Sequence, residues 1–203
     1  MDQSAIKNFL QSFQDKRDRT IAVVDFGNVE KWKESLGWRV GIRELARLAK
    51  NFSIGNKFLR RFYYGVDYGP KENSKELSPW SRYIFETASM NGFEAISKRV
   101  KYIHSSSNIN GFDKKCDLDV EMAIDLVEQR DFYDNLLLFS GDGDLMRAIE
   151  YLKKSYGKHC MVMSARGHIG REVLDAKSNG IVEEIIFAED FEYRLNMDRF
   201  VKS

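Results

Sequence analysis

Two short acidic motifs have residue types and spacing that can support chemistry. One is DFGN at residues 25–28, and the other is SGDGD at residues 140–144; each directly follows an apolar run. Such runs are typical of strands buried on both faces of a parallel sheet, and ligands of these sheets bind beyond the carboxyl ends of the strands. Carboxylates are the oxygen ligands that Mg²⁺ prefers. We therefore expect Asp25, Asp142 and Asp144 to share one metal site.

Each of these acids also has a plainer explanation. Asp142 or Asp144 alone can be a helix cap, because aspartate suits a helix N-terminus and its dipole. Asp25 alone can be a turn residue. Two acids at one strand end, with neighbouring glycines that let the backbone approach a ligand closely, exceed what a cap requires. The pairing with a second acidic strand end favours a functional site.

A third group of acids lies in residues 117–125, within a predicted helix. Helical spacing places Asp119 on the same stripe as Met122 and Leu126, so we expect its carboxylate to point toward the sheet. A buried carboxylate is costly unless it is paired or bound to a metal. Glu121 falls on the wetter side of the helix, and Asp125 falls at the border of the stripe. Asp117 begins the helix, where a simple cap is the alternative.

The composition sets limits on the class of protein. The chain has 203 residues, is 43% hydrophobic, and carries 32 basic against 31 acidic residues. This balance is weak evidence against binding nucleic acid by bulk charge alone. No stretch approaches the roughly 18 apolar residues of a membrane span, and the N-terminus lacks the pattern of a signal peptide. Cys116 and Cys160 are far apart, which favours free thiols and a cytoplasmic location.

Strands and helices are expected to alternate along most of the chain. The expected strands are 20–25, 57–64, 93–103, 135–139, 159–163 and 182–187. The expected helices are 4–15, 39–51, 79–90, 118–130, 144–155, 169–178 and 189–199, with loops at 67–79 and 104–114. This order predicts a single three-layer α/β domain over residues 1–203, with a central parallel sheet flanked by helices.

No arrangement of a nucleophile and a base competes with the acids. His104, His159 and His168 are scattered and form no HxxxH pair. The DGD of residues 142–144 is not a calcium loop either, because residues 145–148 supply no further ligands. Chemistry based on carboxylates and a metal ion remains the best interpretation.

Taken together, the motifs resemble the NYN domain (LabA-like) family of PIN-fold ribonucleases. The resemblance rests on VVDFGN at 23–28, DLDV at 117–120 and SGDGDL at 140–145, and it covers residues 20–187. It implies a PIN-like, Rossmann-like fold and an Mg²⁺- or Mn²⁺-dependent endonuclease that acts on single-stranded RNA. It places Asp25, Asp119, Asp142 and Asp144 at the metal and catalytic positions. The supporting positions are Asn28, Asp117 and Ser140.

Basic and aromatic side chains around the acids would hold the RNA. Arg166 and Arg171 follow a predicted strand end, on the same side as the acids, and are the preferred pair for phosphate contacts. Lys115 and Arg147 are further candidates. Other bases and the aromatic residues that could stack on unpaired bases are Lys98, Arg99, Lys101, Lys114, Tyr102, Phe112, Trp32 and Trp38.

Two other functions stay open at this point. One is a regulatory or RNA-binding scaffold that keeps the fold without cutting, although the full set of acids argues against it. The other is a DNA-directed nuclease of the PIN-like kind, although no duplex-gripping element is evident. The sequence leaves open whether the chain forms a homodimer, and it indicates no membrane association.

Overall fold

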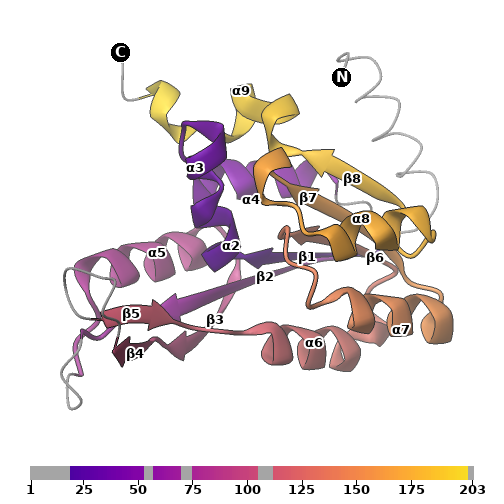
Figure 1. Ribbon diagram of the computed structural model, residues 1–203, viewed down its shortest axis with the longest axis horizontal. Helices are drawn as coiled ribbons and strands as arrows, with labels where there is room; N and C mark the ends of the chain where they lie inside the picture. Colours follow the sequence, from indigo (N-terminus) through magenta and orange to yellow (C-terminus); the bar gives the residue numbers. More distant parts are fainter. Residues whose placement is uncertain (1–18, 53–56, 70–74, 105–111, 201–203) are drawn as a thin grey trace.

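A six-stranded parallel sheet forms the centre of the protein. The structure is a computed structural model that describes residues 19–52, 57–69, 75–104 and 112–200. The strand order is β3-β2-β1-β6-β7-β8, and each neighbouring pair is parallel (Figure 1). The strand bounds are β1 Arg19–Asp25, β2 Lys57–Val66, β3 Glu94–Arg99, β6 Asn135–Phe139, β7 His159–Ser164 and β8 Glu184–Phe187. The helix expected at 4–15 lies outside the described residues.

The two acidic motifs follow the two strands at the middle of the sheet. β1 pairs with β2 on one side and with β6 on the other, and Val24 lies opposite Phe139. All five residues of β6 are buried, as are the five central residues of β1. Continuous apolar runs are required here because helices cover both faces. Parallel pairing therefore brings Asp25, the last residue of β1, and Ser140, the first residue after β6, to the same edge of the sheet.

Helices cover the sheet on both faces and make a three-layer α/β fold. On one face α4 (Ile42–Asn51), α5 (Pro79–Met90) and α9 (Glu192–Leu195) contribute to a core that includes Val24. On the other face α6 (Asp119–Glu128), α7 (Met146–Tyr156) and α8 (Arg171–Ser178) enclose a second core that includes Val23. Neighbouring residues of β1 thus serve opposite cores, as the strand period of two dictates. In Figure 1, α6 and α7 lie below the sheet and α4 and α9 above it.

Two short helices follow β1 that the sequence patterns did not predict. α2 spans Phe26–Lys31 and α3 spans Lys33–Leu36, with the fully buried Trp32 between them. Asp25 caps α2, because its side chain accepts a hydrogen bond from the backbone N–H of Asn28. Helices of six and four residues are too short to show a clear apolar period. The DFGN motif therefore supplies the N-terminal cap and the first turn of a helix.

The prediction of one strand over residues 93–103 was wrong, because this range contains two strands that belong to different sheets. β3 ends at Arg99, and β4 (Lys101–His104) pairs antiparallel with β5 (Phe112–Lys115) in a separate two-stranded sheet. The backbone of Val100 still bonds to Val66 at the sheet edge. The expected loop at 104–114 was therefore wrong at 104 and at 112–114, and its residues 105–111 lie outside the described residues.

Other element bounds differ by a few residues from the expectations. The helix expected at 118–130 ends at Glu128 and is followed by a 3-10 turn, η1 (Arg130–Phe132). The final helix expected at 189–199 is three short pieces, η3 (Ala188–Phe191), α9 and η4 (Met197–Phe200). Within the described ranges, no helix has the length and apolar character needed to cross a bilayer.

Candidate metal centre

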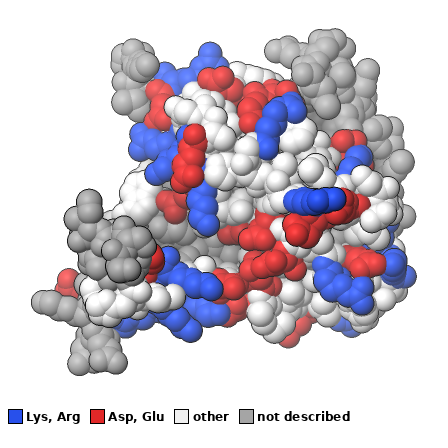
Figure 2. Space-filling view, in the orientation of Figure 1, with Lys and Arg blue, Asp and Glu red and all other residues white. Residues whose placement is uncertain are grey.

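A cleft of about 880 Å³ opens at the carboxyl edge of β1 and β6. Asp25, Asp119, Asp142 and Asp144 all line it, together with Asp117. Figure 2 shows acidic side chains gathered in a band across a hollow of this face, with basic side chains beside one end of the band. The structure thus brings the four predicted acids into one cleft from three separate parts of the sequence.

Three of these acids lie close enough together to bind one ion. Asp119, Asp142 and Asp144 each offer a carboxylate oxygen, and these atoms all lie within 4.8 Å of one another. Asp119 is the first residue of α6. The other two lie in the loop after β6, where the backbone N–H of Asp144 donates to Asp142 Oδ1 at 3.1 Å. Oxygen ligands in such a group suit a hard divalent cation.

Asp25 is held in place by two hydrogen bonds. Its Oδ1 accepts from the backbone N–H of Asn28 at 3.2 Å, and its Oδ2 accepts from Ser140 Oγ at 3.1 Å. Burial raises the pKa of Asp25, while these two hydrogen bonds act in the opposite direction and the charge of Asp142 raises it further. Removing a carboxylate from water favours its neutral form unless a positive charge compensates. Such a half-buried acid beside other acids fits a cation site.

Ser140 and Asn28 connect the two motifs. Ser140 Oγ also accepts a hydrogen bond from the backbone N–H of Asp142 at 3.1 Å. Asn28 Oδ1 accepts from the backbone N–H of Gly141 and from Trp32 Nε1, both at 2.9 Å. The ends of β1 and β6 are therefore joined by side chains as well as by the sheet, and the acids between them are fixed relative to each other.

Gly141 is required by close packing of the loop after β6. Its carbonyl accepts from the backbone N–H of Gly170 at 2.7 Å. A Cβ atom added at position 141 would lie 1.8 Å from the carbonyl oxygen of His168. The segment that follows β7 therefore braces the acidic loop, and only glycine allows this approach.

The carboxyl groups of Asp117 and Asp119 shift each other's pKa. Burial, together with a hydrogen bond and the negative charge of Asp117, raises the pKa of Asp119 to about 7, and the charges of Asp142 and Asp25 add to this. The pKa of Asp117 is lowered, mainly because its carboxylate accepts a hydrogen bond from the backbone N–H of Asp119. Like charges this close favour a proton or a cation on one of them. The donor set is thus suited to a hard divalent cation.

The other two acids named from α6, Glu121 and Asp125, do not line the cleft and interact with other side chains. Glu121 forms an ion pair with Lys98 at 2.6 Å. Asp125 accepts a hydrogen bond from Tyr63 at 2.5 Å and lies 3.6 Å from Arg61. Their places agree with the helical stripe, which put Glu121 on the wetter side and Asp125 at its border.

The basic residues around the acids differ from the expected set. Lys31, Lys114 and Lys115 line the cleft, whereas Arg147, Arg166 and Arg171 do not. Arg166 pairs with Asp190 at 3.1 Å and lies 4.0 Å over the ring of Phe187. Arg147 pairs with Glu150 at 2.7 Å, and the exposed Arg171 lies 3.9 Å from Asp175. Of the bases proposed from sequence for RNA contacts, only Lys114 and Lys115 line the cleft.

Lys31 and Trp80 line the cleft and have side chains suited to nucleic acid, but the sequence analysis did not propose them. Lys31 ends the unpredicted helix α2, so nothing in the sequence indicated its direction. Trp80 lines the cleft from the first turn of α5, next to a proline at the N-terminus of that helix. Trp32, in contrast, is fully buried and cannot stack on a nucleic-acid base.

Comparison with known proteins agrees with this arrangement. The NYN domain profile matches residues 19–184. This chain belongs to the NYN domain family. NYN domains are PIN-like nucleases, so membership accounts for both the three-layer fold and the acidic cleft, as the sequence motifs indicated.

Two relatives define how far the likeness extends. The low amplitude and bright protein LabA of Synechococcus elongatus is 40% identical over 85 residues, which is 42% of this chain and 45% of LabA. This chain therefore spans less than half the length of that relative. A crystal structure of a protein of unknown function from Vibrio parahaemolyticus superposes with a TM-score of 0.63 and 20% identity, covering 87% of this chain and 96% of that one. That structural likeness shows the fold alone.

Proposed function

We propose that this NYN domain is a metal-dependent endoribonuclease that hydrolyses phosphodiester bonds of single-stranded RNA. Asp25, Asp119, Asp142 and Asp144 would hold Mg²⁺ or Mn²⁺ and form the catalytic group. The observation that carries the proposal is the approach of three carboxylate oxygens to within 4.8 Å of one another, beside the half-buried Asp25. Clustered acids repel one another, and a bound cation would remove this repulsion.

Hydrogen bonds within the chain hold the carboxylates of this site in place without a substrate. A bound divalent ion can lower the pKa of water and stabilise charge on phosphate oxygens. Asn28 and Ser140 fix the Asp25 carboxylate through the hydrogen bonds described above. Ser140 also fixes the loop that carries Asp142. Preorganisation of this kind reduces the rearrangement needed to reach the transition state.

The side chains that line the cleft also favour a single strand as the substrate. Lys115 and Lys114 line it from β5, and Lys31 lines it from α2. Lys114 already pairs with Asp67 at 2.6 Å, so we place the main phosphate contacts on Lys115 and Lys31. Trp80, which is 49% exposed, lines the same cleft and can stack on an unpaired base. The exposed Arg171 and Arg147 stay candidates for contacts with a longer strand.

We also propose that the protein acts in a reducing compartment such as the cytoplasm. Cys116 and Cys160 are both free thiols. Cysteines in oxidising compartments are usually paired in disulfides.

The decisive experiment is incubation of the purified protein with labelled RNA and DNA of the same sequence. Each is offered single-stranded and as a duplex, with Mg²⁺, Mn²⁺ or EDTA. We expect internal cuts in the single-stranded RNA with either ion and none with EDTA, and loss of cutting in Asp142→Asn. The control is Asp131→Asn, an exposed acid outside the cleft.

Other outcomes would replace the proposal. Cutting of DNA alone would make the protein a DNA-directed nuclease. RNA binding without cutting under every ion would support a regulatory scaffold. Cutting that survives EDTA and Asp142→Asn would exclude the carboxylate site as its source.

A further inference from the structure

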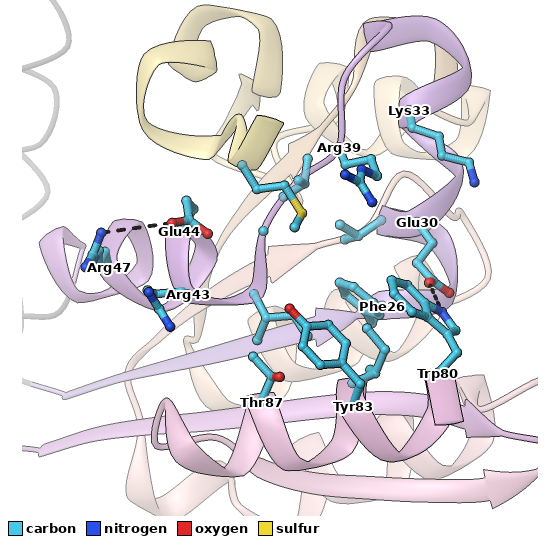
Figure 3. Close-up of a pocket in the computed structure, with 16 residues that line it drawn as sticks. Phe26, Glu30, Lys33, Arg39, Arg43, Glu44, Arg47, Trp80, Tyr83 and Thr87 are labelled. Atoms are coloured by element: carbon cyan, nitrogen blue, oxygen red, sulfur yellow. Dashed lines mark hydrogen bonds and ion pairs between the residues drawn. The ribbon is translucent and has the colours of Figure 1, made fainter. Parts of the chain in front are cut away.

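A second cavity, of about 540 Å³, lies beside the acidic cleft on the other side of α2. Its lining comes mainly from α2, α3, α4 and α5 and includes Met197 (Figure 3). Sites for small organic groups typically have volumes of roughly 300–1,000 Å³. The cavity is therefore large enough for one nucleotide, and none of the four proposed metal ligands lines it.

Two exposed aromatic rings stand at the edge of this cavity. Trp80 and Tyr83 of α5 are each 49% exposed, and their rings are stacked with centroids 5.6 Å apart and an interplanar angle of 28°. Behind them the lining is apolar, from the buried Phe26, Val29 and Ile84. Large rings left half exposed over an apolar floor offer a flat surface on which a base can stack.

The polar part of the lining is mostly basic. Four basic side chains line the cavity, against two acidic ones, Glu30 and Glu44. The basic residues are Lys33, Arg39, Arg43 and Arg47. Figure 3 shows Arg43 and Arg47 on α4, across the cavity from Trp80. This excess of positive charge favours an anionic ligand.

Two of these four bases remain available for a ligand. Arg39 binds Asp198 through a 2.6 Å ion pair, and Arg47 lies 3.9 Å from Glu44. Within the described part of the chain, Arg43 and Lys33 take part in no ion pair. Guanidinium groups bind phosphate in a planar, bidentate way. Arg43 is therefore the best-placed group for a phosphate.

The cavity adjoins the acidic cleft. Glu30 and Trp80 line both, and the Trp80 Nε1–H donates to Glu30 Oε1 at 3.0 Å. These two side chains thus form the shared wall between the acids and the aromatic pair. Trp80, Tyr83 and Arg43 all line the cavity beyond this shared wall.

We propose that this cavity is a nucleotide subsite for the single-stranded RNA that is cut in the acidic cleft. A base of the same strand stacks on the Trp80–Tyr83 pair, and a neighbouring phosphate binds Arg43. The proposal rests on the proposed ribonuclease function for the identity of the strand. An apolar floor beside aromatic rings suits a base, and the excess of basic groups suits the phosphate attached to it.

The first test measures binding alone, so that it does not depend on cleavage. The protein carries Asp142→Asn, and its affinity for a 5′-labelled single-stranded RNA is measured by fluorescence anisotropy. Tyr83→Ala should weaken binding by about 5- to 150-fold, the range for loss of one stacked base. Tyr83→Phe, which keeps the ring, should bind nearly as tightly as the parent. Tyr151→Ala is the control, because Tyr151 is similarly exposed at 46% on α7, over the other face of the sheet.

The second test identifies the base in the cavity. One abasic nucleotide is moved stepwise along the RNA, and each RNA is measured with the parent and with Tyr83→Ala. At one position the abasic change and Tyr83→Ala should not add, because they remove the same stacking contact. Arg43→Gln should make the salt dependence of binding shallower, by about 0.7 in the slope of log affinity against log salt. Lys154→Gln on α7 serves as its control.

The outcomes separate this proposal from the function of the acidic cleft. Additive losses at every abasic position, or unchanged binding in Tyr83→Ala, overturn the subsite even if the wild type cuts RNA. A non-additive position supports the subsite even if no cutting is seen with any ion. Failure of the parent to bind RNA at all overturns the subsite.

Discussion

The side chain of Asn28 accepts a hydrogen bond from the backbone N–H of Gly141, 113 residues away in sequence, at 2.9 Å. The same oxygen accepts from the indole Nε1–H of Trp32. This one amide therefore fixes the end of β1 to the start of the acidic loop after β6. The relative positions of Asp25 and Asp142 depend on it.

Replacing Asn28 by Ala should lower both stability and activity. The change leaves two donors without their partner, which costs about 1–3 kcal/mol for each one that stays buried. A displacement of about 1 Å between the acids can lower the rate about 100-fold. Urea denaturation and cleavage of one labelled RNA measure the two effects. Asn179→Ala, at an exposed side chain after α8, should change neither.

Replacing Asp25, Asp119 or Asp144 by Asn should abolish cleavage without unfolding the protein. Asparagine keeps the size of the side chain and removes the negative charge that would hold the ion. Relief of repulsion between the acids should leave the melting temperature unchanged or slightly higher. Gel assays of cleavage and circular dichroism of each variant are the measurements. Full activity in a folded Asp144→Asn protein would exclude this residue from the mechanism.

Divalent metal should stabilise the fold more strongly as the pH rises. The pKa of Asp119 is raised to about 7, against about 4 in the unfolded chain. In the metal-free protein this acid therefore stabilises the fold at low pH, and that stability is lost as the pH rises from about 4 to about 7. Over the same window protons compete less with the ion. Mn²⁺ at about 100 times its Kd adds about 2.7 kcal/mol, or roughly 5–10 °C.

Thermal melts with and without Mn²⁺, at pH values from 5 to 8, test this expectation. The gain in melting temperature should grow with pH in the wild type and be mostly lost in Asp142→Asn. Asp119→Asn should remove most of the pH dependence of the metal-free protein. Equal gains in the wild type and in Asp142→Asn would mean that the ion binds elsewhere.

Replacing Gly141 by Ala should destabilise the protein and displace the acids. The new Cβ would lie 1.8 Å from a backbone carbonyl oxygen of residue 168, which cannot move aside like the tip of a flexible side chain. We expect a loss of stability of at least about 1–3 kcal/mol, the usual cost of overpacking. Gly27→Ala is the matched control, since its Cβ meets only an ordinary contact at 3.5 Å. Chemical denaturation of both variants gives the comparison.

The acids could be placed from the sequence because local patterns determine their directions. Asp25 and Asp142 follow apolar runs that become the central strands, and parallel pairing then brings the strand ends together. Asp119 shares a helical stripe with the buried Met122, so its direction followed from the period of the helix. Each of these inferences needs only neighbouring residues and the known geometry of a parallel sheet.

The bases could not be placed in this way, because their partners are distant. Arg166 turns toward Asp190, 24 residues further along the chain, and no local pattern indicates that pair. Lys31 depends on a helix of six residues, and Lys115 on a small sheet formed by β4 and β5. A long basic side chain on a surface can reach several possible partners. Their directions are therefore set by the tertiary fold.

Lys115 and Arg166 should give opposite results in RNA binding. Lys115 lines the cleft, so Lys115→Gln should weaken binding and make its salt dependence shallower by about 0.7 in log–log slope, as expected for one phosphate contact to a single strand. Arg166→Ala should leave RNA binding unchanged and instead lower stability by up to about 1 kcal/mol, because its guanidinium pairs with Asp190 and lies over Phe187. Salt titrations of binding and urea denaturation of both variants are the measurements. A loss of RNA affinity in folded Arg166→Ala, with none in Lys115→Gln, would move the path of the strand from the lysines of β5 to the segment after β7.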